Sequence, residues 1–480
     1  MAFGSARIER LLEKYSARMS SPIDPKRVEA TPEKRFFISM LVKDIELIPA
    51  ILDLVDNSVD GAKGLRPDEL ASGRFEGLYV RLQLSAERFR IEDNCGGIDV
   101  SHARTYAFRF GRAAGVHGPE GEVGQFGVGM KRALFKLGSA FWVESIAAHS
   151  SFVLPVDVDE WAADRSPDWK FEFEEVDETA EHPDAERGTI IEVTRLKPSV
   201  AADFENDRFL SRLRAALELR HQEALQSRIE LKLGDVQLRP IVPMLRASDD
   251  LRPVHIERDI SENGGVVRMA LFAGVEGGEG GEPGDDESDA EAFKQPSRAG
   301  WYLFCNDRLL LAADQTPLTG WGVAAAAYHP QYRLFRGYVY LTATDSSLLP
   351  WNTTKTGVDE DSSVFRQVQS EMFDALRMVQ VVLNRAKKER QDREPDDRPV
   401  LAAMSSANPV RVRDVPQSEM FVAPPDPPRR RRTAATTKRI VYSVDLRDFV
   451  KVAEELGTTS GADVGRLTFG YYYEHEVPEE

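Results

Sequence analysis

The feature that most constrains this chain is a glycine-rich run that leads directly into an apolar helix. The run spans residues 124–131, and the apolar pattern after it predicts a helix from Met130 to Leu137. Backbone N–H groups at such a helix start cradle phosphate groups, and a lysine there adds a positive point charge. The alternative is a flexible loop with an ordinary helix cap. The candidate phosphate-binding residues are Gly124, Gln125, Phe126, Gly127, Val128, Gly129, Met130 and Lys131.

A second polar pattern lies on a helix predicted from Pro49 to Ala62. Asp53, Asn57 and Asp60 are spaced four and three residues apart, so they share one face of this helix. The amide oxygen of Asn57 is a hard ligand suited to Mg²⁺. Asp53 has the chemistry to orient, or take a proton from, a water that attacks a phosphate. The alternative is a solvated face on an amphipathic helix.

A third motif follows two short predicted strands, at residues 78–84 and 89–92. Asp93 stands at the end of the second strand, and a turn containing Gly97 and Ile98 comes directly after it. Glycine has no side chain to obstruct a ligand that lies against the backbone. The alternative for this motif is an ordinary turn.

In this order, the motifs at residues 53–60, 93–98, 124–131 and 188–189 resemble the Bergerat ATP-binding fold of the GHKL superfamily. This superfamily includes the gyrase B subunit, the heat-shock-90 chaperones, histidine kinases, mismatch-repair MutL and the microrchidia (MORC) ATPases. The resemblance implies an α+β or α/β fold, a Bergerat-type α/β sandwich that binds ATP and Mg²⁺.

The resemblance also implies roles for single residues. Asp93 would accept the adenine amino group, with Gly97 and Ile98 beside the base. Thr189 would help to hold the phosphates or the adenine through water. The glycine-rich segment 100–123 would form the mobile ATP lid.

Two positions depart from the family pattern. Asp53 stands where the family has a catalytic glutamate, so its carboxylate falls short by about 1.5 Å. Positioning errors of this size slow phosphoryl transfer, and hydrolysis is therefore expected to be slow. Glu46 is an alternative base, but Pro49 suits a first helical turn and would leave Glu46 outside the helix. Cys95 occupies the place of the first family glycine.

A second domain is expected after the ATPase motifs. Strands on either side of a turn at 305–308, a strand at 333–342 and a long amphipathic helix at 363–390 resemble the βαβ-like transducer domain of gyrase B, MutL and MORC proteins. In that domain a loop lysine reaches the γ-phosphate, and Lys355 is the candidate here. A solvated surface lysine is the alternative.

The sequence predicts five segments along the chain. They are an N-terminal segment (1–35), the ATPase domain (36–200), a transducer-like domain (201–392) with a disordered acidic loop (274–292), a polar, proline-rich linker (393–438) and a small C-terminal module (439–480). The module is expected to hold a strand at 440–442, a helix at 446–456 and an aromatic-rich element at 464–473. Its docking onto a protein partner or a second copy is a hypothesis.

Composition restricts the partners. The formal net charge of −17 over 480 residues argues against nucleic-acid binding over the whole surface. A local basic cluster, Arg429 to Arg432, suits a DNA backbone, with a solvated linker as the alternative. Two cysteines argue against a disulfide framework or a zinc site. Neither a signal-like start nor a membrane-length apolar run is present, so a cytoplasmic location without membrane contact is expected.

Two functions remain open. The first is an ATP-gated homodimeric clamp of the MORC or MutL type, associated with DNA in repair, genome maintenance or phage defence. The second is a heat-shock-90-like chaperone ATPase that acts on protein clients, although the long middle and dimerisation regions of that family are missing. A histidine kinase is disfavoured because no phosphoacceptor-histidine helix precedes the ATP motifs. A type II topoisomerase is disfavoured because no length remains for a cleavage domain.

Overall fold

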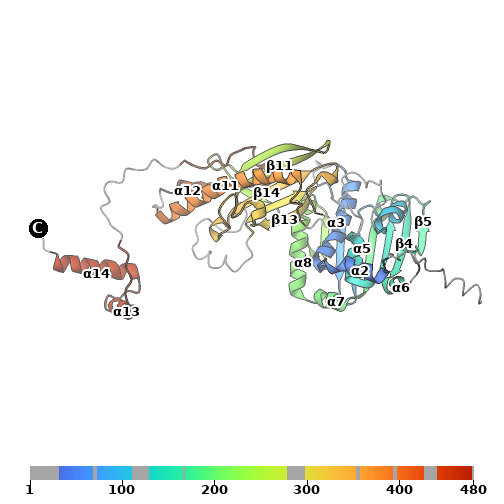
Figure 1. The fold of residues 1–480 in the computed structure, drawn as a ribbon, viewed down its shortest axis with the longest axis horizontal. Coiled ribbons are helices and arrows are strands. Elements are labelled where there is room, and N and C mark those ends of the chain that lie inside the picture. The colour runs from blue at the N-terminus through green and yellow to red at the C-terminus, as the bar shows by residue number, and fades with distance from the viewer. Residues whose placement is uncertain are drawn as a thin grey trace, which may run out of the picture. The chain divides into compact units, whose positions relative to one another are not determined.

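Eight strands form the first of two main sheets (Figure 1). The computed structural model describes residues 32–68, 73–110, 129–164, 166, 168–277, 298–352, 357–392, 397–425 and 440–477. The strand order is β5-β4-β3-β6-β2-β1-β7-β8; the β1–β7 pair is parallel and the other pairs are antiparallel. The strands are β1 Tyr79–Leu84, β2 Arg88–Asp93, β3 Gly138–Ile146, β4 Ser151–Asp157, β5 Glu175–Asp177, β6 Gly188–Leu196, β7 Glu230–Leu233 and β8 Val236–Gln237.

A layer of helices covers one face of this sheet (Figure 1). In β1, Val80 and Leu82 are fully buried whereas Arg81 and Gln83 are not, which is the alternation expected when one face of a sheet is covered. The helices are α2 Lys34–Lys43, α3 Leu47–Leu65, α4 Val100–His102, a π-helical turn at Ala103–Ala107, α5 Gly129–Leu137, α6 Val158–Ala163, α7 Pro198–Phe204, α8 Asp207–Arg220 and α9 Gln222–Gln226, with a 3₁₀ turn at Asp184–Glu186.

Helix α3 is the central helix of this layer and carries the Asp53 motif. Its N-cap is Glu46, which is extended, and Pro49 lies in the first turn, where a proline removes no helical hydrogen bond. Ile51 and Val55 are fully buried one turn apart. The sequence prediction that Glu46 lies outside the helix is therefore confirmed, although the helix begins two residues earlier and ends three residues later than expected.

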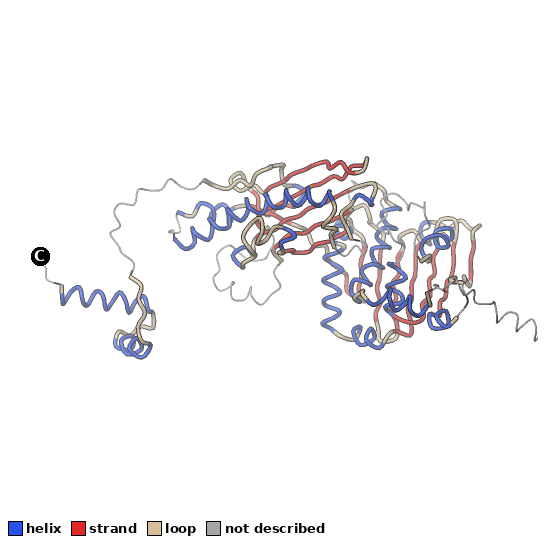
Figure 2. Tube along the Cα trace, in the orientation of Figure 1, coloured by secondary structure: helices blue, strands red, loops and turns tan. Residues whose placement is uncertain are grey.

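The second main sheet has five strands in the order β10-β11-β14-β12-β13. Figure 2 shows the strands in red and the helices that pack on them in blue. The β12–β14 pair is parallel and the others are antiparallel. These strands and their associated elements are β10 Val254–Glu262, β11 Gly265–Val275, β12 Gly300–Cys305, β13 Arg308–Asp314, β14 Phe335–Thr342, the long helix α11 Ser363–Asp392, and 3₁₀ turns at Pro317–Thr319, Pro330–Tyr332 and Ser346–Leu348.

Both faces of the second sheet are covered. Every residue of β12 is buried, because α11 packs on one face and an aromatic layer lies on the other. A two-stranded ribbon of β9 Met244–Ala247 and β15 Asn408–Arg411, with a 3₁₀ turn at Val412–Asp414, contributes Leu245, Val412 and Val415 to that layer.

Three predicted boundaries differ from the structure. The first core continues beyond residue 200 to Leu238, because β7 pairs with β1 and α8 packs on α3. Part of the expected linker is folded: α12 Pro399–Ser406 buries Val400 and Met404 against the second core, and β15 pairs with β9. The acidic loop was expected from residue 274, but β11 continues to Val275, and residues 278–297 lie outside the described part of the chain.

The described residues 440–477 belong to a compact unit separate from the preceding part of the chain. The helix expected at 446–456 is confirmed as α13 Leu446–Glu455, and the aromatic-rich element is a helix, α14 Gly461–Glu476. The strand expected at 440–442 is wrong: these residues are exposed and have no regular structure, because they pair with no other strand of the described chain. No helix in the described ranges is long and apolar enough to cross a membrane.

Candidate nucleotide-binding site

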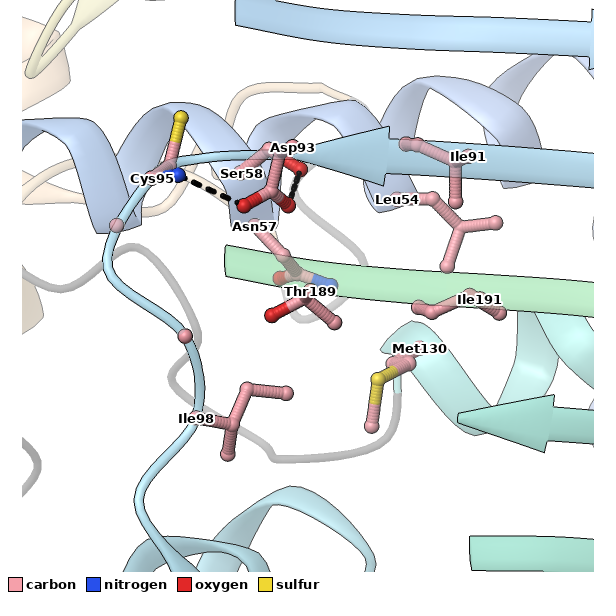
Figure 3. A pocket seen from close by; sticks show the side chains of 12 residues that line it. Leu54, Asn57, Ser58, Ile91, Asp93, Cys95, Ile98, Met130, Thr189 and Ile191 are labelled. Carbon is pink, nitrogen blue, oxygen red and sulfur yellow. Dashed lines mark hydrogen bonds between the residues drawn. The ribbon is translucent and has the colours of Figure 1, made fainter. Parts of the chain in front are cut away.

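Asp93, at the end of β2, lies at the centre of a pocket between α3 and the first sheet (Figure 3). Its Oδ2 accepts a hydrogen bond of 2.6 Å from the Ser58 hydroxyl on α3, and its Oδ1 accepts one of 2.9 Å from the Cys95 backbone N–H. Burial raises the pKa of Asp93, and these hydrogen bonds oppose that rise. The Thr189 backbone N–H also bonds to this carboxylate, so the group is held in one orientation.

The pocket brings together six residues expected at the site. The expected residues that line it are Asn57, Asp93, Gly97, Ile98, Met130 and Thr189. The other lining residues are Leu54, Ser58, Gly61, Ile91, Cys95 and Ile191. A mainly apolar lining with a few polar groups suits a flat heteroaromatic base.

Gly97 is required by backbone packing at the edge of the pocket. Its φ of +72° is in the left-handed region, and a Cβ atom there would lie 2.0 Å from the Ile146 carbonyl oxygen at the end of β3. The neighbouring Ile98 N–H donates to Ser145 Oγ at 2.6 Å, and that hydroxyl lies 3.2 Å from Thr189 Oγ1. The turn after Asp93 is therefore anchored on β3 and β6.

Cys95 fits the position where the family has glycine. Its thiol is buried and contacts the Tyr79 carbonyl oxygen at 3.8 Å, while its backbone N–H holds Asp93. Burial raises the pKa of this thiol, so the group stays protonated at neutral pH. The substitution thus preserves the backbone contact with Asp93.

Asp53 does not line the pocket but joins a buried cluster of charges beside it. Arg308 Nη2, from the first residue of β13, lies 2.8 Å from Asp53 Oδ1. Arg308 Nη1 is 3.0 Å from Asp56 Oδ2, and Arg220 Nη2 is 2.8 Å from the same oxygen. His221 Nε2 contacts Asp56 Oδ1 at 3.1 Å. The cluster joins α3 and α8 to the second sheet.

The two carboxylates of this cluster differ in protonation. Burial raises the pKa of Asp53, although Arg308 opposes the rise. Burial would also raise the pKa of Asp56, but Arg220 and Arg308 hold it well below its usual range. Asp56 is therefore a fixed anion, whereas the protonation of Asp53 depends on its neighbours.

The start of α5 lies next to Asp53, but Lys131 points elsewhere. A Cβ atom at Gly129 would lie 3.6 Å from Asp53 Oδ2. The Lys131 side chain is fully buried, and its ammonium donates to the Ala107 carbonyl oxygen at 2.5 Å. Burial lowers the pKa of Lys131 to about 7. A phosphate contact by Lys131 stays a prediction, and it requires the ammonium to leave Ala107.

The expected magnesium ligand is accessible. Asn57 is exposed and lines the pocket, whereas Asp60 is half-buried and does not line it. In the described part of the chain, no group of three or more His, Cys, Asp or Glu side chains is arranged to hold a metal ion.

Some expected site residues lie outside the described residues: Gly124, Gln125, Phe126, Gly127, Val128 and Lys355. Sequence reasoning also missed several residues that the structure brings to the site. Ser58 could have been predicted, since it follows Asn57 on the helix that carries the Asp53 motif. Nothing in the sequence links Asp53 to Arg220, His221 or Arg308, because these residues lie more than 150 positions away along the chain.

Comparison with known proteins agrees with the geometry. Residues 45–189 match the family model described as histidine kinase-, DNA gyrase B- and HSP90-like ATPase. This range begins just before α3 and ends at Thr189, so it contains all four motifs. No curated protein matches the chain. Residues 45–189 thus carry a GHKL-type ATPase domain.

Proposed function

We propose that the chain binds ATP with Mg²⁺ and hydrolyses it slowly, with Asp53 as the catalytic base. The observation that carries this proposal is Asp93, which is oriented by Ser58 and Cys95 in a pocket whose walls come from all four motifs. Asp93 would accept the adenine amino group, and the turn at 124–129 would hold the phosphates. Bound Mg²⁺ would neutralise charge on the phosphate oxygens, with Asn57 as its protein ligand.

The residues present fit such a ligand. Asp93 is an oriented carboxylate acceptor, Gly97 lines the pocket without a side chain, and Asn57 offers an exposed amide oxygen. Isothermal titration calorimetry of the full chain with ATP tests the proposal, with and without magnesium. Saturable binding that is strengthened by magnesium is expected, and no heat of binding at millimolar ATP would contradict the proposal.

Ser58→Ala is expected to weaken ATP binding by about 2- to 10-fold, because Asp93 loses the hydrogen bond that orients its Oδ2. Calorimetry on the purified variant measures the change. Ser39→Ala is the matched control, since that hydroxyl bonds only to the Phe36 carbonyl of its own helix in the described structure. Equal affinities for Ser58→Ala and the wild type would show that Asp93 needs no such support.

We further propose that ATP closes a homodimer and that Lys355 detects the γ-phosphate. A lysine that contacts the triphosphate but not the diphosphate is a differential contact, which can shift a two-state equilibrium. Lys355→Ala is therefore expected to bind ATP normally but to stay monomeric with an ATP analogue. Sedimentation with ATP analogue and with ADP measures this, and a Lys355→Ala protein that still dimerises would exclude this lysine as the sensor.

We propose DNA as the macromolecule on which the clamp acts, through the basic cluster Arg429 to Arg432 or through the cavity of the closed dimer. This cluster lies outside the described residues, and the proposal is supported by its charge in an otherwise acidic chain. Duplex DNA is expected to stimulate ATP turnover, and the stimulation should fall as salt rises. The chaperone function would be favoured instead if DNA does not change the rate of ATP turnover and the protein protects an unfolded client protein from aggregation. A protein partner of the C-terminal module stays a prediction.

A further inference from the structure

Arg308 is the residue of the second sheet that enters the charge cluster on α3. Its side chain is only 9% exposed, and its two terminal nitrogens contact Asp53 and Asp56 at 2.8 and 3.0 Å. Along the chain, Arg308 and Asp53 are 255 residues apart. The arginine therefore reaches the catalytic position only when the second sheet is docked against α3.

The hairpin turn that carries Arg308 is rigid. Asn306 and Asp307 both have positive φ, +46° and +65°, as in the tight two-residue turns that match the twist of paired strands. The Asn306 side chain exchanges two hydrogen bonds of 3.0 Å with the backbone of Ala343, beyond the end of β14. Arg308 is thus fixed to the frame of the second sheet.

The two oxygens of Asp53 have different surroundings. Oδ1 is held by Arg308 at 2.8 Å, with Arg220 further away at 3.7 Å. Oδ2 faces the start of α5, where a Cβ at Gly129 would be 3.6 Å away. One oxygen is therefore anchored, and the other faces the end of the glycine-rich turn.

We propose that Arg308 is a positioning residue for Asp53, supplied by the second domain, so that efficient ATP turnover requires this domain to be docked on α3. This inference rests on the proposed function, in which Asp53 is the base. A base must be ionised and must face its water, and a fixed guanidinium on the opposite oxygen favours both conditions.

The charges around Asp53 explain why Arg308 matters. Burial and Asp56, on the same helix, raise the pKa of Asp53, whereas Arg308 from β13 and Arg220 from α8 lower it. The neighbouring helix α5 contributes the backbone of Gly129 near Asp53. Without Arg308, the carboxyl would keep only the more distant Arg220 as a counter-charge and would protonate at higher pH.

Other contacts hold the same interface together. Lys63 of α3 donates to the Asn306 carbonyl oxygen at 2.8 Å, and Arg413 pairs with Glu223 at 2.9 Å. Removing Arg308 therefore leaves these docking contacts in place. Arg413→Gln is the matched control, because it removes an arginine from this interface without touching Asp53.

The test compares the full-length wild type with Arg308→Gln, Arg308→Lys and Arg413→Gln. Steady-state ATP turnover is measured against pH, and ATP binding is measured by calorimetry. For Arg308→Gln we expect kcat to fall about 100-fold at neutral pH, with ATP affinity changed little. The acid limb of its pH–rate profile should move to higher pH, since more of Asp53 is protonated. Arg308→Lys should restore the limb in part, and Arg413→Gln should keep the wild-type limb.

A second readout needs neither nucleotide nor turnover. With ¹³Cγ-labelled aspartate, and with Asp53 assigned from the Asp53→Asn spectrum, NMR follows the titration of this carboxyl directly. In Arg308→Gln its midpoint should rise by about one pH unit or more.

Three outcomes would overturn the inference. They are a wild-type acid limb and titration in Arg308→Gln, equal losses in Arg308→Gln and Arg413→Gln, or a faster Arg308→Gln enzyme, which would mean that the arginine restrains the base. If the wild type binds but does not hydrolyse ATP, the proposed hydrolysis fails, and the role of Arg308 in it fails too. The titration of Asp53 then still shows whether Arg308 controls its charge.

Discussion

Replacing Asp93 with asparagine is expected to reduce ATP affinity by at least about 10- to 100-fold, the value of a hydrogen bond to a charged group. Asparagine has one oxygen where aspartate has two, and its NH₂ group must face either Ser58 or the Cys95 N–H. If the NH₂ group faced the Cys95 N–H, two hydrogen-bond donors would oppose each other. If it faced Ser58, the serine hydroxyl would have to rotate and accept a hydrogen bond instead of donating one. Either orientation disturbs the group that would accept the adenine amino hydrogen.

Calorimetry with ATP and with ADP measures this loss, because both ligands carry the same base. Glu92→Gln is the matched control: it removes a carboxylate from the adjacent position of β2, where Glu92 pairs with Arg90 at 3.1 Å. The control should bind ATP as the wild type does. If Asp93→Asn also binds with wild-type affinity, the assignment of Asp93 to adenine is wrong.

Asp53→Asn is expected to lower ATP turnover by about 10²- to 10⁴-fold, the usual contribution of a general base. The amide nearly matches the carboxylate in shape but accepts no proton. Adenine and magnesium contacts lie elsewhere in the proposed site, so ATP binding should persist. Single-turnover hydrolysis and calorimetry on the same preparation separate the two effects.

Two further variants sharpen this result. Glu46→Gln should leave turnover unchanged, because Glu46 is the exposed N-cap of α3, two helical turns before Asp53. Asp53→Glu should raise turnover, since the longer side chain restores the reach of the glutamate in the family pattern. Unchanged turnover in Asp53→Asn would move the base elsewhere, and a loss in Glu46→Gln would identify it.

The local parts of the site could be predicted from the sequence. Asn57 and Ser58 lie on one helix, and Asp93 and Gly97 lie in one short turn. In each motif, residues that are close in sequence determine the local backbone conformation. Gly97 is an example. Its positive φ and its close approach to Ile146 permit almost no residue except glycine, so the residue type itself indicates this backbone conformation. The order of such motifs was enough to predict the family of the ATPase domain, which the match at residues 45–189 confirms.

Positions that depend on packing could not be predicted in this way. The strand expected at 440–442 is apolar enough to pair, but no strand of the described chain lies beside it. Lys131 follows the glycine-rich turn, yet its ammonium bonds to the Ala107 carbonyl oxygen. In both cases the sequence shows the chemical type of the residue, and the surroundings determine its contacts.

By itself, the sequence determined the local elements that line the pocket: the turn after Asp93, the polar face of α3 and Gly97, which the packing of that turn requires. Only the tertiary structure decided which charged side chains contact Asp53. Arg220 and Arg308 come from a distant helix and a distant hairpin, and a lone arginine in a sequence carries no sign of its partner. The physical reason is that hydrogen-bonded turns and helix faces arise from neighbours in sequence, whereas a buried ion pair exists only where two folded surfaces exclude water together.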